Sequence, residues 1–548
     1  MEGMQGYQYA WLVFLGIGVL FSIRIAVGLW ASRQVKSTSD YIVAGRRLPI
    51  YIAAASIMAT WFAAGTLMGA TSMGYQYGFQ GVIFDPFGAS MCLFLTGFLF
   101  TRVMRRARYL TVVDFFSRRF GVSMSVVASV LQLITYLVWT GAQIVAGGNI
   151  VHALLPSVPV PAAMIIVAGI VTVYTTLGGM LADTLLDFMQ MFLTAGGVTL
   201  IFAGMVAAIG GFDDLFAAGS STLYVSNAFS MAPIPGEGYL GYQGSTGWFY
   251  WVAAWMAVGL GSVPTQDLFQ RSMSAKNEAT AVWGTYFAGF LYLFFGTMSP
   301  LIGIAMFKLN PNIAPENTEF LLVSAAFEHL HPVLTALFIA ALSSALMSTS
   351  DSALLAGAAV FTENLMPLWV KNMTDEVKLR WVRIMVVVIG VVAVTIALTA
   401  ATIYRLGVLA WSILLVGLFT PFLFGMYWKK ANGYGALAAF IGGFLSWVVF
   451  SLLYYPGTLA ACAGDTDCGF WDAIYVASTP AFVVSVISMV VVALATQKVN
   501  KPLPITDVDG KPLDVSLKLG ILPLKHALRA KDDVELDAPA ASRTPAGD

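Results

Sequence analysis

The segment AALSSALMSTSDSALLAGA, residues 340–358, mixes the apolar residues of a membrane helix with six hydroxyl side chains and one carboxylate. On an α-helix, Ala345, Ser348, Thr349 and Ser352 share one face, because they are spaced i, i+3, i+4 and i+7. An ionised Asp351 near the bilayer centre costs at least a few kcal/mol unless it faces protein, water or a cation. Hydroxyl and carboxylate oxygens suit a hard, non-redox cation. The segment therefore predicts an intramembrane cation site, and helix packing by the serines is the alternative.

The composition of the whole chain indicates an all-α polytopic membrane protein. Of its 548 residues, 58% are hydrophobic and only 11% are charged, against about 25% charged in soluble domains. The net charge of zero suggests no nucleic-acid partner. Apolar runs near the ~20 residues that cross a bilayer recur throughout. They predict thirteen spans: 9–30, 50–73, 79–101, 123–150, 160–178, 184–209, 246–267, 279–307, 332–360, 381–403, 405–428, 433–455 and 472–496.

The distribution of Lys and Arg predicts the orientation of these spans. With the N-terminus outside, the outer loops hold only Lys308 and Arg405, and the segment 210–245 holds neither residue type. The inner side and the tail hold most of the others, and we count Arg271 among the residues of the inner loops. This asymmetry follows the positive-inside rule. We therefore expect a multi-pass protein of the plasma membrane with a cytoplasmic C-terminus.

Three further acids fall in or beside predicted spans. Asp187 lies early in span 184–209 but deeper than Asp183, with Gln190 one turn on, and we interpret it as functional. Asp183 is interpreted as a helix-start acid that favours the N-terminal dipole. Asp85 precedes Pro86, which suggests a local break, and its role is left open. The four histidines lie in or near predicted loops, which argues against a zinc or copper site.

Two predicted spans contain helix-breaking sequence at matching positions. Span 50–73 is rich in small residues, and span 246–267 contains Gly259, Gly261 and Pro264. A membrane helix can unwind where it lines a cavity. Interrupted helices at equivalent places in two halves of a chain indicate an inverted-repeat transporter that binds solute near the midplane.

This pattern predicts six regions along the chain. They are a first helix and cytoplasmic loop (1–49), a first half (50–209), an outer loop (210–245), a second half (246–428), two additional helices (429–496) and a cytoplasmic tail (497–548).

Four motifs resemble the sodium/solute symporter family: DYIVAGRRLP (40–49), GGMLADTLLDFMQ (178–190), VPTQDLFQRSMSAKN (263–277) and ALMSTSDSALL (345–355). They occur in the family's order, and the resemblance covers roughly residues 30–450. It implies the leucine-transporter-type fold, a five-plus-five inverted repeat, formed here by the second to eleventh spans. It also implies a sodium-coupled secondary active symporter that imports a small organic solute by alternating access.

The resemblance also implies a sodium site. Its ligands match the carbonyls of the first broken helix and a face of the eighth core helix: Ala59, Phe62, Ala345, Ser348 and Thr349. Some members bind a second sodium, and the matching positions are Asp187, Asp351 and Ser352. Asp351 stands where those members carry a hydroxyl. It is therefore a ligand of a second ion, a structural group or a proton-linked group.

The family's solute lies between the first, third, sixth and tenth core helices. The matching positions are Trp61, Trp139, Val258, Thr265 and Gln266. Val258 replaces a tryptophan of the proline branch, and Thr265 replaces a cage aromatic of the choline-like branch. For the two tryptophans, packing is the alternative to binding. The sequence therefore names no particular solute.

Other function classes were weighed against symport. A transporter-like sensor would need a signalling domain, and the short tail argues against one. A proton-coupled transporter remains an alternative. A channel would need a repeated pore filter, and an enzyme would need a nucleophile–base pair or a metal cluster; we find neither. Cys462 and Cys468 flank the loop CAGDTDC, and they form a disulfide if that loop faces an oxidising compartment; otherwise they are two free thiols.

Overall fold

The computed structural model describes residues 9–34, 38–178, 180–217, 219–371, 373–399, 403–513 and 518–528. In these ranges the regular structure is helical, and β-type pairing is limited to isolated bridges. The chain fold is therefore all-α, as the composition predicted.

The helices follow one another along the chain with few long connections. Their bounds are α1 Ala10–Ser32, α2 Thr38–Val43, α3 Ile50–Ala59, α4 Ala70–Gly81, α5 Ala89–Leu95, α6 Thr101–Ala107, α7 Val112–Phe120, α8 Val122–Leu154, α9 Val160–Gly178, α10 Met180–Ala208, α11 Phe212–Leu215, α12 Gly244–Gly259, α13 Gln266–Met273, α14 Glu278–Gly296, α15 Met298–Leu309, α16 Leu321–His329, α17 Pro332–Val360, α18 Asp375–Thr399, α19 Ile403–Leu414, α20 Thr420–Tyr427, α21 Gly433–Ala461, α22 Thr466–Ala495 and α23 Leu524–Leu528. Short π-helical turns occupy Gly65–Gly69, Ile83–Gly88, Thr96–Phe100, Phe361–Leu365 and Leu415–Phe419, and 3₁₀ turns occupy Ala44–Arg46, Pro315–Phe320 and Met366–Leu368.

Within the described residues, ten helical stretches are long and apolar enough to cross a membrane. The predicted spans 50–73, 160–178 and 246–267 fall on shorter or interrupted helices. The total of thirteen crossings therefore stays a prediction.

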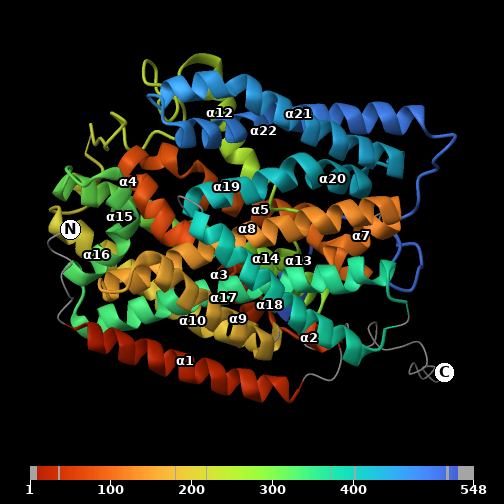
Figure 1. Ribbon diagram of the computed structural model, residues 1–548, viewed down its shortest axis with the longest axis horizontal. Coiled ribbons are helices and arrows are strands. Elements are labelled where there is room, and N and C mark those ends of the chain that lie inside the picture. The colour runs from red at the N-terminus through yellow and green to blue at the C-terminus, as the bar shows by residue number, and fades with distance from the viewer. Residues whose placement is uncertain are drawn as a thin grey trace.

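Figure 1 shows α1 and the pair α21 and α22 on opposite outer sides of the bundle, with α8 and α17 between them. The described part of the segment 210–245 lies at one end of the bundle, and residues 497–513, which follow α22, lie at the other end. Cys462 and Cys468, beside the turn between α21 and α22, form a disulfide.

The two predicted helix breaks are present. α3 ends at Ala59, and the amide of Ala63 donates to the carbonyl of Trp61 (2.8 Å), which takes Ala63 out of the α-helical pattern. α12 ends at Gly259, and α13 begins only at Gln266. At Gly261 a Cβ would lie 2.3 Å from the carbonyl oxygen of Trp411, so only glycine lets the chain pass so close to α19.

The described part of the tail packs across the ends of several helices. The amide of Val508 donates to the carbonyl of Ala107 (3.1 Å), and Trp283 of α14 donates to the carbonyl of Leu522 (2.8 Å). Arg108 pairs with Asp507 (3.7 Å). The described part of the tail is therefore part of the fold.

Candidate functional site

A cluster of buried acids lies where α17 meets α10, α3 and α13. Ser348 donates to Asp183 Oδ1 (2.8 Å) and is also bonded to Asp187 Oδ1. Ser56 of α3 donates to the second oxygen of Asp187 (2.7 Å). Asp187 has no exposed surface and Asp183 has 5%. We call Ser56, Asp183, Asp187, Arg271, Ser348 and Ser352 the acid cluster.

Arg271 supplies the positive charge of the acid cluster. Its Nη2 lies 2.7 Å from Asp183 and 3.3 Å from Asp187, and it also donates to Ser352. Its Nε donates to the hydroxyl of Ser56 (3.0 Å). With both carboxylates ionised, one guanidinium leaves the cluster one formal negative charge. The cluster can therefore stabilise one further monovalent cation nearby.

One sequence interpretation is wrong at this cluster, and another is incomplete. Arg271 was counted among loop residues, but it lies on helix α13 and is completely buried. Asp183 was interpreted as a helix-start acid, and it does lie in the first turn of α10. Both of its oxygens also bond within the acid cluster, because the start of that helix is buried inside the protein.

Thr349 adds an oxygen beside the acid cluster. Its hydroxyl is buried and has no hydrogen-bond partner among the described residues. A buried unsatisfied hydroxyl is costly, and such exceptions point to an absent ligand or water. Ala345 is buried on the same helix, and Ala59 and Phe62 are buried at the α3 break. Hydroxyl and carbonyl oxygens are the types of ligand that suit a hard cation such as sodium.

Asp351 has different partners from Asp187. Arg24 of α1 lies 3.1 Å from its Oδ2, and Thr175 of α9 donates to its Oδ1. Arg24 also donates to the carbonyl of Ser344 (2.7 Å) and lies over the ring of Tyr174. Arg24 and Asp351 are almost fully buried. A charged residue in the first apolar run was the signal that could have revealed this pair.

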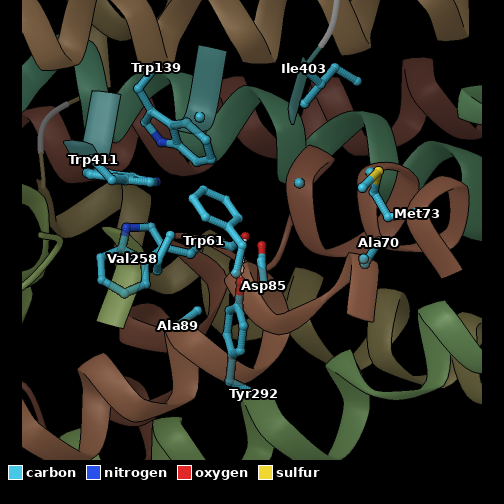
Figure 2. Close-up of a pocket in the computed structure, with 15 residues that line it drawn as sticks. Trp61, Ala70, Met73, Asp85, Ala89, Trp139, Val258, Tyr292, Ile403 and Trp411 are labelled. Atoms are coloured by element: carbon cyan, nitrogen blue, oxygen red, sulfur yellow. Dashed lines mark hydrogen bonds between the residues drawn. The ribbon is translucent and has the colours of Figure 1, made fainter. Parts of the chain in front are cut away.

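A separate pocket lies between the break that follows α3 and helix α19. Its cavity of about 20 Å³ has room for roughly one water molecule. The predicted residues Trp61, Trp139 and Val258 line it. The other lining residues are Gly65, Gly69, Ala70, Met73, Gly81, Phe84, Asp85, Ala89, Tyr292, Ile403, Gly407 and Trp411. Figure 2 shows Trp61 and Trp139 on either side of Trp411 and Asp85 near the centre.

The pocket walls are aromatic, and its polar group is acidic. The ring centroid of Trp411 lies 5.2 Å from that of Trp139 and 5.9 Å from that of Trp61. Asp85 accepts hydrogen bonds from Tyr292 (2.9 Å) and Thr66 (2.8 Å). In the described part of the chain, no lysine or arginine lines the pocket. The lining therefore suits a positively charged or apolar group, and a molecule larger than water requires the pocket to widen.

The remaining two predicted solute residues lie outside this pocket. Gln266 accepts from the amide of Val112 (2.7 Å) and donates to the carbonyl of Leu110 (3.1 Å). Thr265 donates to the carbonyl of Ser262 (2.8 Å). Thr265 therefore stabilises the α12–α13 break, and Gln266 ties the start of α13 to the backbone at the start of α7.

A broken-helix bundle with a buried oxygen cluster and a separate small pocket is typical of secondary transporters. Residues 41–443 match the model of the sodium:solute symporter family, and the chain belongs to this family and is a symporter. The human high affinity choline transporter 1 is 26% identical over 470 residues, covering 81% of this chain and 79% of the relative. The osmoregulated proline transporter of Bacillus subtilis is 24% identical over 512 residues, covering 89% and 96%. The sodium/glucose cotransporter of Vibrio parahaemolyticus is 27% identical over 462 residues, covering 76% and 81%.

The fold is similar to that of a solved transporter. A substrate-bound Na⁺-coupled sialic acid symporter superposes with a TM-score of 0.68 at 19% identity, covering 90% of this chain and 99% of that structure. The arrangement of helices is thus that of a known secondary transporter.

Proposed function

We propose that this chain is a sodium-coupled symporter that imports a small organic cation by alternating access. The observation that carries the proposal is the pairing of two separate sites: a buried oxygen site with net negative charge and an aromatic pocket with its own carboxylate. The family and the Na⁺-coupled structural neighbour support sodium as the coupled ion.

The proposed sodium ligands are the carbonyls of Ala59, Phe62 and Ala345 and the hydroxyls of Ser348 and Thr349. The net charge of the acid cluster favours a cation here. Asp187 and Ser352 are the other candidate ligands of a second sodium, and both already bond to Arg271. Both oxygens of Asp351 are bonded to Arg24 and Thr175. This argues against Asp351 as an ion ligand and favours its structural role.

The proposed solute is a cation because of what the pocket offers. A cation over a tryptophan face gains about 0.5–2 kcal/mol, and Asp85 supplies a counter-charge. A zwitterionic amino acid would also need a cationic partner for its carboxylate, and a sugar would need many hydrogen-bond donors and acceptors. Of the relatives above, the choline transporter has the solute chemistry that best fits these walls.

Asp85→Asn should reduce the apparent affinity for choline tenfold or more. The substitution removes a close counter-charge, and a loss of about 1.4 kcal/mol of binding free energy lowers the affinity tenfold. The measurement is uptake of labelled choline into proteoliposomes under an inward sodium gradient, with proline, glucose and acetate as competitors. Asp472→Asn is the matched control, since Asp472 is a half-buried acid that accepts from Tyr242 and Tyr250 away from the pocket. Preferred uptake of proline or glucose, unchanged by Asp85→Asn, would reject the cationic solute.

We also propose thirteen crossings, with the halves 50–209 and 246–428 as the five-plus-five inverted repeat. Each half contains one of the two helix breaks. The N-terminus lies outside the plasma membrane and the tail is cytoplasmic, in keeping with the Lys and Arg distribution.

Labelling with a membrane-impermeant maleimide tests the orientation. Ser221→Cys, in the segment 210–245, should react in intact cells, and Lys511→Cys should react only after permeabilisation. Both side chains are exposed, and the native cysteines are either paired in the disulfide or buried. The opposite pattern would reverse the topology.

A further inference from the structure

The short helix α13 carries two buried charged residues one turn apart. Asp267 and Arg271 are spaced i, i+4 and therefore lie on the same face of the helix. They have 1% and 0% of their surfaces exposed. One turn of helix advances about 5.4 Å, so this short helix contacts both the wall of the solute pocket and the acid cluster.

The Asp267 end of α13 holds a wall of the solute pocket. Trp61 donates its indole N–H to Asp267 Oδ2 (2.9 Å), and Tyr136 of α8 donates to Oδ1 (3.0 Å). The amide of Asp267 in turn donates to the hydroxyl of Tyr136 (2.8 Å). Asp267 thus joins the break of α3, the start of α13 and the long helix α8. It does not line the pocket, and it fixes the indole that does.

The Arg271 end of α13 holds the acid cluster. Arg271 bonds to Asp183, Asp187 and Ser352. The same two acids accept hydrogen bonds from the hydroxyl of Ser348. Ser348 is also a proposed sodium ligand. A sodium ion bound there adds one positive charge beside Arg271, and the repulsion between the two cations changes the electrostatic attraction that holds α13 to the acid cluster.

We propose that α13 couples the two sites, with Asp267 as the residue that positions Trp61 for the solute in response to the ion. This inference rests on the proposed function and deepens it, because it names the physical link between sodium and solute. Two ligands are coupled when each changes the affinity of the other by the same factor. Without Asp267 or without the indole N–H, the solute pocket should lose its response to sodium.

The test compares choline dissociation constants of the purified full-length protein in saturating sodium and in sodium-free potassium buffer. We expect sodium to tighten choline binding by about fivefold or more in the wild type, the lower range of measured couplings. Asp267→Leu removes both acceptors at similar size, and Trp61→Phe removes the donor and keeps an aromatic wall. Each substitution should reduce the effect of sodium on the choline dissociation constant to less than twofold. The double variant should lose no more of this effect than either single variant.

Two further variants separate positioning from general damage. Asp267→Asn keeps one acceptor for the indole and should restore most of the sodium effect. Asp472→Leu removes another carboxylate that accepts from two tyrosines, outside both sites, and should leave the effect intact. In Asp267→Leu and Trp61→Phe, sodium alone should still raise the melting temperature, because the ion ligands are unchanged.

The outcomes distinguish this inference from the proposed function. If sodium does not change choline affinity in the wild type, the proposed function and the α13 connection both fail. If the wild type shows the effect and Trp61→Phe or Asp267→Leu keeps it, only the α13 connection fails. Independent, multiplying effects of the two substitutions would also overturn it, and Trp61→Phe decides the question if Asp267→Leu does not fold.

Discussion

Thr349→Ala raises the sodium concentration for half-maximal uptake tenfold or more without lowering the stability of the protein. One lost oxygen ligand is expected to cost on the order of 1.4 kcal/mol, which is tenfold in affinity. Stability should survive because the hydroxyl of Thr349 has no partner among the described residues. Sodium titration of uptake, beside a melting curve in sodium-free buffer, measures both quantities.

Ser348→Ala should weaken sodium at least as much, but with a second cost. Its hydroxyl also bonds to Asp183 and Asp187, so its loss leaves two buried acids short of a donor. Ser350→Ala is the matched control on the same helix, since the hydroxyl of Ser350 donates back to the carbonyl of Leu346 (2.8 Å). Thr349→Ser keeps the oxygen and should retain sodium affinity. Normal sodium dependence in the double variant of Ser348 and Thr349 would refute the site.

Breaking the pair of Arg24 and Asp351 should destabilise the protein by about 3–5 kcal/mol, because it leaves one buried charge without its partner. Arg24→Leu and Asp351→Leu should each reduce the folded yield and the melting temperature. The double variant should recover much of the loss, since no unpaired charge remains. Asp467→Asn is the contrasting case, because its pair with Arg405 is partly exposed and should contribute about 1 kcal/mol or less.

The same variants decide the role of Asp351. If Asp351→Asn lowers sodium affinity or changes the charge moved per solute at wild-type stability, Asp351 belongs to the ion pathway. If it lowers only the folded yield, then Asp351 is the structural anchor by which α1 is attached to α17. The contacts with Arg24, Ser344 and Thr175 favour the second result.

The sequence predicted what depends on local periodicity. The face with Ser348 and Thr349 follows from helical spacing, and the breaks in α3 and α12 follow from clustered small residues, glycine and proline. Predictions of this kind are reliable because the geometry of a helix determines which of its own residues share a face.

The partners of the buried charges could not be predicted in the same way. Arg24 and Asp351 are 327 residues apart, and Arg271 lies 88 residues from Asp183. No periodicity relates such pairs, because tertiary packing alone brings them together. Arg271 also satisfied the positive-inside count, so its burial had no separate signal. The pocket residues Trp411 and Tyr292 were also missed. An aromatic residue in a membrane helix packs against other helices as often as it contacts a solute, so its presence in the sequence does not reveal a pocket.

Choline accumulation in proteoliposomes under separately imposed ion gradients tests the central claim most directly. An inward sodium gradient, with no proton gradient, should drive choline above its equilibrium distribution, and collapse of the gradient should abolish accumulation. Because sodium and choline both carry positive charge, an inside-negative potential should increase it further. Accumulation driven by a proton gradient without sodium, or uptake that never exceeds equilibrium, would contradict sodium-coupled symport.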